Sequence, residues 1–198
     1  MLHKSLRRSA FVLAFQALLA IDSPSVLLAQ NSNPTTLANS QAMNQDNPFY
    51  QASKLPFQAP DFAAIKPEHF ASAFEAGFKQ QLDQVRAIAD QVDPPSFDNT
   101  LVAMEKSGEI LTRVSAVFFN LAGAHTNESI QEIEQAVAPK LARHSDDIYL
   151  NKKLFARVES LWNQRQDLKL SEEQQRLLKK TYEDFVRAGA RLTEVQQA

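Results

Sequence analysis

Hydrophobic residues recur every three or four positions along most of the chain, which is the periodicity of an amphipathic helix. The clearest series runs from Phe70 to Ile88, so we predict a helix from about Pro67 to Asp90. Similar series predict helices at roughly 98–122, from Asn127 to about Leu150, at roughly 152–166, and from Ser171 almost to the C-terminus. The pattern therefore predicts an all-α fold, an array of about five amphipathic helices.

Several residues mark where these helices start, bend or stop. Pro94 and Pro95 should end the first helix, and Gly123 should end the second. Pro139 predicts a kink inside the third helix. Ser171 and Gln174 have the spacing of a capping box at the start of the last one.

Two helices look incomplete as they stand. The helix at 98–122 carries Val102, Ile110, Val117 and Phe119 outside its main apolar face, so we expect it to be buried on several sides. The last helix meets no stop signal in the final residues TEVQQA. These two features predict that the chain is a fragment of a larger protein, truncated at its C-terminus.

The segment from Asn47 to Ala64 differs from the helices because prolines punctuate it. Pro48, Pro56 and Pro60 should keep it extended. It also contains apolar side chains, which we expect to be buried along a helical surface: Phe49, Tyr50, Leu55, Phe57 and Phe62.

The first residues are interpreted as an export signal. Residues 1–8 include three Lys or Arg residues and no acidic one, and residues 10–21 are apolar except for Gln16. That order is typical of a secretory signal peptide, and the apolar run is too short for a permanent membrane span. We expect residues 1–29 to be removed, with cleavage after Ala29 favoured over Ala20, and the protein to be periplasmic or secreted. An amphipathic N-terminal helix of a cytosolic protein is the alternative.

The composition changes sharply after the signal and again at residue 47. Residues 30–46 are almost entirely polar and cannot bury enough apolar surface to offset the entropy of ordering, so we expect a disordered linker. Residues 47–198 form the helical region.

Charge and cysteine content exclude some classes of function. The formal net charge of −2 becomes more negative once the basic first segment is removed, so no nucleic-acid partner is indicated. The chain has no cysteine, which excludes disulfides, thiolate metal sites and a cysteine nucleophile. Nothing in it predicts stable membrane insertion.

The histidines are the first candidates for metal ligands. His3 lies in the signal. Glu68 and His69 resemble the end of an inverted H-x-x-E-H zinc motif, but the required first histidine is replaced by Ile65, so helix-start residues are the favoured interpretation.

The other two histidines also lack suitable partners in the sequence. His125, in the loop AGAHTN, is interpreted as a residue that binds backbone groups left free at a helix end, although a ligand or proton carrier was considered. His144 is followed by Asp146 and Asp147, but on a helix these point to different faces. We therefore assign no catalytic and no metal-ligating residue, and the substrate-binding residues stay unassigned.

No complete catalytic motif occurs: H-E-x-x-H, G-x-S-x-G, a P-loop, G-x-G-x-x-G and a calcium loop are all missing. Three runs of sequence nevertheless resemble a known family: NPFYQASKLPFQAPDFAAIKPEHFASAFEAG, SFDNTLVAMEKSGEILTRVSAVFFNLAGAHTN and APKLARHSDDIYLNKKLFARV. They are similar to the opening of mature bacterial dipeptidyl carboxypeptidases, members of the thimet-oligopeptidase-like zinc metallopeptidases. The resemblance extends from about Asn47 to Leu192.

The resemblance implies a large helical enzyme with a deep channel between two halves. Such an enzyme removes dipeptides from peptide C-termini with one zinc ion, held by an H-E-x-x-H helix and a downstream glutamate. Those elements lie beyond the matching region, so no cofactor is expected in this chain, and peptides are expected partners only when the catalytic half is present. We expect this chain to form part of the channel wall and to be inactive alone.

Two further functions were considered. The chain could be a non-catalytic helical module that binds peptides or docks a catalytic half. It could also be a structural helical domain without a ligand.

Overall fold

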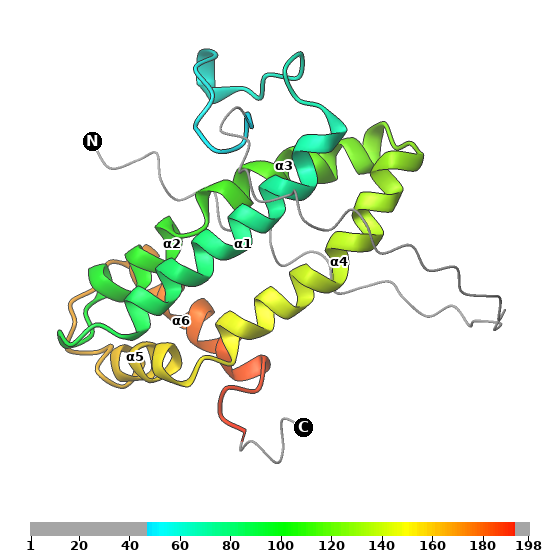
Figure 1. The fold of residues 1–198 in the computed structure, drawn as a ribbon. Helices are drawn as coiled ribbons and strands as arrows, with labels where there is room; N and C mark the ends of the chain where they lie inside the picture. The colour runs from blue at the N-terminus through cyan, green and yellow to red at the C-terminus, as the bar shows by residue number, and fades with distance from the viewer. Residues whose placement is uncertain (1–46, 193–198) are drawn as a thin grey trace, which may run out of the picture. The chain divides into compact units, whose positions relative to one another are not determined.

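The computed structural model describes residues 47–192, and within them helices are the only regular secondary structure, so the predicted all-α fold is confirmed. The predicted signal peptide at 1–29, the linker at 30–46 and the final residues TEVQQA lie outside the described part. The described residues form a short 3-10 turn, a π-helix and six α-helices, of which α2 is a single turn that continues the π-helix. Figure 1 shows how the labelled helices are arranged. Their bounds are η2 Pro56–Gln58, α1 Pro67–Ala89, η3 Phe97–Val102, α2 Ala103–Lys106, α3 Glu109–Ala124, α4 Glu128–Tyr149, α5 Lys152–Asn163 and α6 Glu172–Arg187.

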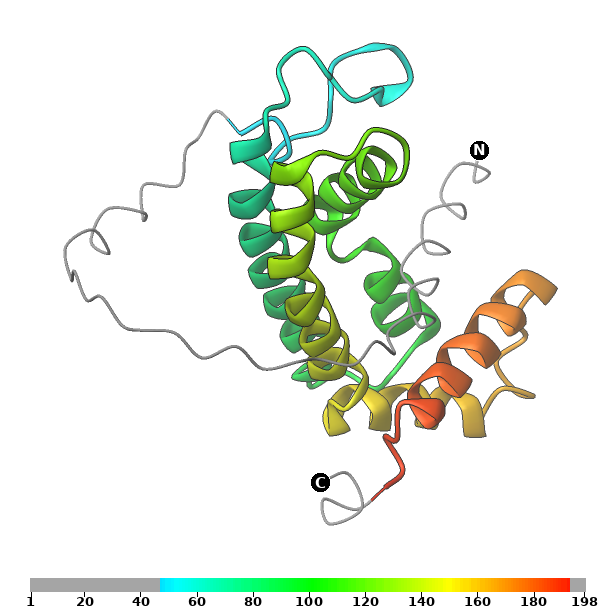
Figure 2. The ribbon, with the colours of Figure 1, turned by 90° about the vertical axis from the view of Figure 1, so that its right-hand side faces the viewer.

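Helix α1 is the element on which the others assemble. Its first half packs between α3 and α4, which run beside it in both views (Figures 1 and 2). Here Phe74 meets Phe118 of α3 edge to face, with ring centroids 5.4 Å apart. Its second half packs against α5, α6 and the end of α4, where Val85 and Ile88 are buried. One amphipathic helix therefore contributes to two hydrophobic cores.

The contact between α1 and α3 is unusually close at Gly77. A Cβ atom added there would lie 2.9 Å from the Cα of Leu111, a separation that real Cβ atoms do not show. Only glycine lets the two backbones approach in this way.

The prediction of one continuous helix at 98–122 is wrong. The chain forms η3 and α2, breaks at Ser107 and Gly108, and restarts as α3. Gly108 has φ of 73°, in the left-handed region, so an L side chain at this position would be strained. Along α3, Val117 is buried, whereas Ile110 and Phe119 are half-buried.

The last helix also ends earlier than predicted, because a stop signal was overlooked. Helix α6 ends at Arg187, and Gly189 follows with φ of 95°. The N–H of Ala190 donates to Phe185 O at 3.0 Å and that of Gly189 to Val186 O at 3.1 Å. These two bonds form a Schellman motif, which satisfies carbonyls that a helix end leaves free.

The remaining helix limits agree closely with the sequence. Asn127 caps α4, and its side chain accepts from Ile130 N at 3.0 Å. Helix α4 continues through Pro139. Helix α5 stops at Asn163, slightly before the predicted 166. The capping box of Ser171 and Gln174 is present at the start of α6.

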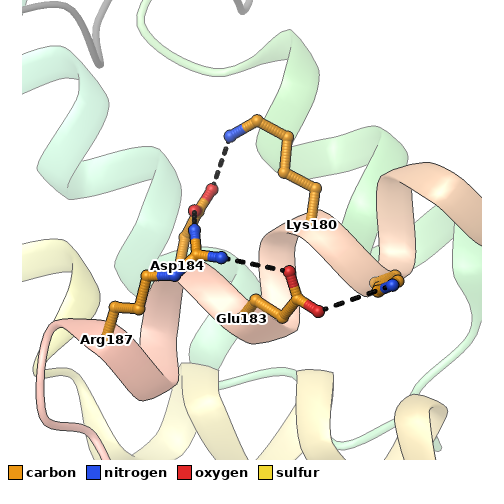
Figure 3. A network of polar contacts seen from close by, with 5 residues as sticks. Lys180, Glu183, Asp184 and Arg187 are labelled. Carbon is orange, nitrogen blue, oxygen red and sulfur yellow. Dashed lines mark hydrogen bonds and ion pairs between the residues drawn. The ribbon is translucent and has the colours of Figure 1, made fainter.

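Charged side chains of α6 form a network of ion pairs (Figure 3). Asp184 pairs with Lys180 at 2.7 Å and with Arg187 at 3.4 Å. Glu183 pairs with Arg187 at 3.3 Å. Pairs spaced by three or four residues stabilise a helix by only a few tenths of a kcal/mol each, roughly 0.2–0.5, so this network supports α6 and defines no site.

The proline-punctuated segment before α1 is buried only in its first part. Phe49 packs against Phe70 with ring centroids 5.4 Å apart, and Tyr50 is half-buried. Arg113 of α3 donates to Phe49 O at 3.0 Å and to Tyr50 O at 3.2 Å. The prediction of burial is wrong for the second part, where three side chains are exposed: Leu55, Phe57 and Phe62.

Candidate functional site

His69 lies in the first turn of α1, where it contributes to the helix start. Its Nδ1 accepts a hydrogen bond from the backbone N–H of Lys66 at 3.1 Å. Lys66 is the residue that precedes the helix, so the imidazole satisfies a donor that the helix itself leaves free. This geometry agrees with the interpretation of Glu68 and His69 as helix-start residues.

His125 lies at the end of α3 and is exposed. Its own backbone N–H donates to Leu121 O at 2.8 Å and closes the last turn. The sequence had suggested a role at this helix end, and the structure shows that the main chain of His125 makes the bond there.

His144 is the one candidate that is buried. On α4 its Nε2 lies 2.7 Å from Gln81 Oε1 of α1, and its ring centroid lies 4.9 Å from that of Phe78. Because a carbonyl oxygen only accepts, Nε2 carries the proton, given the assigned orientation of the glutamine amide. The other ring nitrogen, Nδ1, is buried with no hydrogen-bond partner in the described structure.

The environment of His144 disfavours its charged form. Burial lowers the pKa of His144 below its usual 6.5, and the nearby charge of Asp147 opposes that effect. Asp146 and Asp147 are themselves exposed, whereas His144 faces the core. The three side chains therefore do not converge on a metal.

A metal would need a cluster of suitable side chains, and residues 47–192 contain no group of three or more His, Cys, Asp or Glu residues that could hold an ion. The described residues thus do not fit a zinc site. Over the same range, no helix combines the length and apolar character needed to cross a membrane.

A glutamine cluster on α1 was missed by the sequence analysis. Gln84 Oε1 accepts from Gly108 N at 2.8 Å, and Gln80 Oε1 accepts from Ile110 N at 3.2 Å. Gln81 Nε2 donates to Ser107 Oγ at 3.4 Å. These bonds satisfy backbone and hydroxyl groups at the break before α3. The signal available in the sequence was Gly108, whose left-handed backbone starts a new helix.

A buried arginine on α5 was missed as well. Arg157 donates to Gln91 O and Asp93 O, each at 3.1 Å, and to Asn99 Oδ1 at 2.9 Å. It therefore ties the loop after α1 to η3. Its Nε lacks a partner in the described structure, and its recorded acceptors are oxygens of neutral groups. A charged group of this kind is held by several hydrogen bonds and has a structural role here.

A shallow surface groove of about 370 Å³ with a mixed polar and apolar lining lies between α5 and α6. Trp162 lies at its edge and stacks on Tyr182, with ring centroids 4.6 Å apart. The cations of the groove are already engaged: Arg165 covers Trp162, Arg176 pairs with Glu173, and Lys179 contacts a carboxylate further along α6. Two of the three cations of the groove thus have a carboxylate partner, and the third lies over an aromatic ring.

Comparison with known proteins finds relatives of a single name. No protein-family model matches the sequence. The chain is 45% identical over 152 residues to a dipeptidyl carboxypeptidase of Salmonella typhimurium (strain LT2), a match that covers 77% of this chain and 22% of that protein. It is 42% identical over 156 residues to the dipeptidyl carboxypeptidase of Escherichia coli (strain K12), covering 79% of this chain and 23% of the relative. The chain therefore spans less than a quarter of the length of these curated relatives.

Proposed function

We propose that this chain forms the N-terminal helical part of an exported zinc peptidase. It matches two bacterial dipeptidyl carboxypeptidases over about three quarters of its own length. The whole enzyme would remove dipeptides from the C-termini of peptides. The identity of 42–45% to two proteins of that name is the observation that carries the proposal.

The chemistry is assigned to the part of the enzyme that this chain does not span. His69 caps a helix, His125 lies at a helix end, and His144 bonds to a glutamine, so none of them is available with two further ligands. We therefore assign no catalytic step to the described residues and propose that the isolated polypeptide is inactive.

The role proposed for the helical region is to form part of the wall of the substrate channel. Such a wall must keep its shape when peptide binds. Support comes from the close approach of α1 and α3 at Gly77 and from the hydrogen bonds of Gln80 and Gln84 to the start of α3. Together they fix these two helices relative to each other.

Hydrolysis of a blocked tripeptide, measured with added zinc, tests the inactivity of the chain. We expect no release of a C-terminal dipeptide above the rate without protein. A rate that follows the purified chain and is abolished by a chelator would contradict the proposal. Peptide binding without hydrolysis would favour the non-catalytic module considered from the sequence.

Export is tested separately, by N-terminal sequencing of the chain recovered from the periplasm of an expressing bacterium. We expect the mature protein to begin at Gln30. Recovery from the cytoplasm with the first residues intact would contradict the assignment of residues 1–29 as a signal peptide.

A further inference from the structure

The segment Leu55–Phe62, which we call the aromatic strip, exposes apolar side chains at high density. Leu55 is 44% exposed, Phe62 is 58% exposed, and Phe57 is fully exposed. In the described part of the chain the remaining large exposed apolar residues, Val92 and Leu192, stand alone. Single exposed apolar residues are ordinary on a protein surface, whereas a group of them marks an interaction site.

The aromatic strip is held in a defined conformation. The N–H of Gln58 donates to Leu55 O at 2.9 Å and that of Ala59 to Pro56 O at 3.1 Å, which closes the short turn η2. Leu55 N donates to Ser53 Oγ at 3.2 Å. After the turn, the N–H of Ile65 donates to Asp61 O at 3.1 Å, just before α1 begins. The backbone that carries the exposed side chains is therefore held in a defined turn.

The backbone of the strip is strained where its most exposed side chain lies. Phe57 and Gln58 both have φ of 57°, in the left-handed region that residues other than glycine rarely adopt. Strain of this kind persists only when surrounding contacts require it. The side chain of Phe57 is fully exposed within residues 47–192, so its own burial does not compensate for this strain.

We propose that the aromatic strip is the surface on which the remaining polypeptide of the full-length enzyme docks. This inference rests on the proposed function, since it requires that the chain acts as part of a larger peptidase. The match covers only 22–23% of either relative, so more than three quarters of such an enzyme is available to cover the strip. The surface of the remaining polypeptide that contacts the strip would be apolar, with pockets for the rings of Phe57 and Phe62.

Two other occupants are less well supported. Residues 30–46 contain only Leu37 and Met43 as large apolar residues, too few to cover three exposed ones, and residues 1–29 are proposed to be removed. A second copy of the chain would have to match one strip with another. Within residues 47–192 no complementary apolar surface accompanies the strip, because the other large exposed apolar residues there, Val92 and Leu192, are isolated. Both occupants are outcomes that the experiment can report.

The test uses a fusion of the full 198-residue chain to the polypeptide that follows the matched region in the Escherichia coli relative. A photo-cross-linking amino acid replaces Phe57 in one sample and Val92 in a matched control, because Val92 is 97% exposed and lies outside the strip. After illumination, proteolysis and mass spectrometry locate each cross-link. Release of a dipeptide from a blocked tripeptide is measured on the same fusion without the cross-linker.

We expect a cross-link from position 57 into the polypeptide derived from the relative, in at least tenfold higher yield than from position 92. A cross-link into residues 1–46, a cross-link to a second copy, or equal yields from both positions would overturn the docking proposal. The activity readout separates the two ideas. A fusion that cross-links as expected but hydrolyses nothing counts against the proposed function, and an active fusion without the cross-link counts against the docking surface alone.

Discussion

The segment before α1 has two parts that are similar in composition, yet the first is buried and the second is exposed. The first part places Phe49 against Phe70 and has its carbonyls held by Arg113. The second part, the aromatic strip, leaves Phe57 and Phe62 in solvent. Both parts combine proline with aromatic residues, so composition does not distinguish them.

The difference lies in what faces each part. Phe49 meets a surface made by α1 and α3, and Arg113 supplies donors for main-chain oxygens that burial would otherwise leave unpaired. No such donor or apolar surface faces Phe57 within the described residues. An apolar side chain is buried when a complementary surface is present, and for the strip that surface is proposed to lie in the rest of the enzyme.

The largest effect is expected from Phe49→Ala. Phe49 is 3% exposed, so its removal leaves a cavity and should lower the free energy of unfolding by about 3 kcal/mol. Phe62→Ala is the matched control, because the same side chain is removed from an exposed position, and its effect should stay within about 0.5 kcal/mol. Urea unfolding of both variants measures the comparison, and equal losses would contradict it.

Arg113→Ala should have the next largest effect. The change removes two hydrogen bonds and leaves Phe49 O and Tyr50 O without those donors, which we expect to cost about 1–3 kcal/mol. Amide hydrogen exchange should become faster around residues 49–53 and stay unchanged in α6. Arg86→Ala removes an exposed arginine with a surface ion pair and serves as control. If it destabilises the chain as much as Arg113→Ala does, the hydrogen bonds of Arg113 are not responsible.

Acid should weaken the core that holds Phe49 without changing the strip. Burial lowers the pKa of His144 in the folded state, so the unfolded state binds the proton more readily. The stabilisation is therefore fully present above the unfolded value of 6.5 and is lost as the pH falls below it toward the folded value. Unfolding measured between pH 8 and pH 5 should show this loss, and His144→Gln should reduce it. A pH dependence that is identical in the variant would assign the effect to other groups.

The smallest effect, and one of opposite sign, is expected from Phe57→Gly. The left-handed backbone at this position costs a residue with a side chain about 1–2 kcal/mol more than glycine. The larger conformational entropy of glycine in the unfolded chain offsets about 0.4–1 kcal/mol of this gain, and no burial is lost. The isolated chain should become slightly more stable in urea unfolding. In the fusion described above, the same change should instead be destabilising. A loss of stability in the isolated chain would show that Phe57 already packs against something there.

Local features of this fold could be predicted from the sequence, and features that depend on distant residues could not. The helix starts at Asn127 and Ser171 could be predicted because capping is local: each side chain bonds to the residue three positions later in the chain. The break at Gly108 was missed because a lone glycine inside a periodic apolar pattern is often tolerated. The stop at Gly189 was missed because the apolar Leu192 continues the periodicity past it.

The same distinction holds for the candidate site residues. The sequence excluded a metal cluster around His144 from helix geometry, but it could not reveal Gln81, which lies on another helix. The hydrogen bonds of Arg157 likewise join segments far apart in the sequence. The exposure of Phe57 could not be predicted, because the sequence shows that this side chain is apolar but not which surface covers it.

The glycine contact between α1 and α3 has a mechanical consequence. If α3 slid along α1 by one turn, about 5.4 Å, the backbone of Leu111 would meet Ala73 or Gln81, whose Cβ atoms need the space that Gly77 leaves empty. Translation of one helix along the other is therefore blocked at this point of contact. Since the hydrogen bonds of Gln80 and Gln84 join the same two helices beside this contact, a conformational change that passes through the pair would have to move α1 and α3 together as one unit.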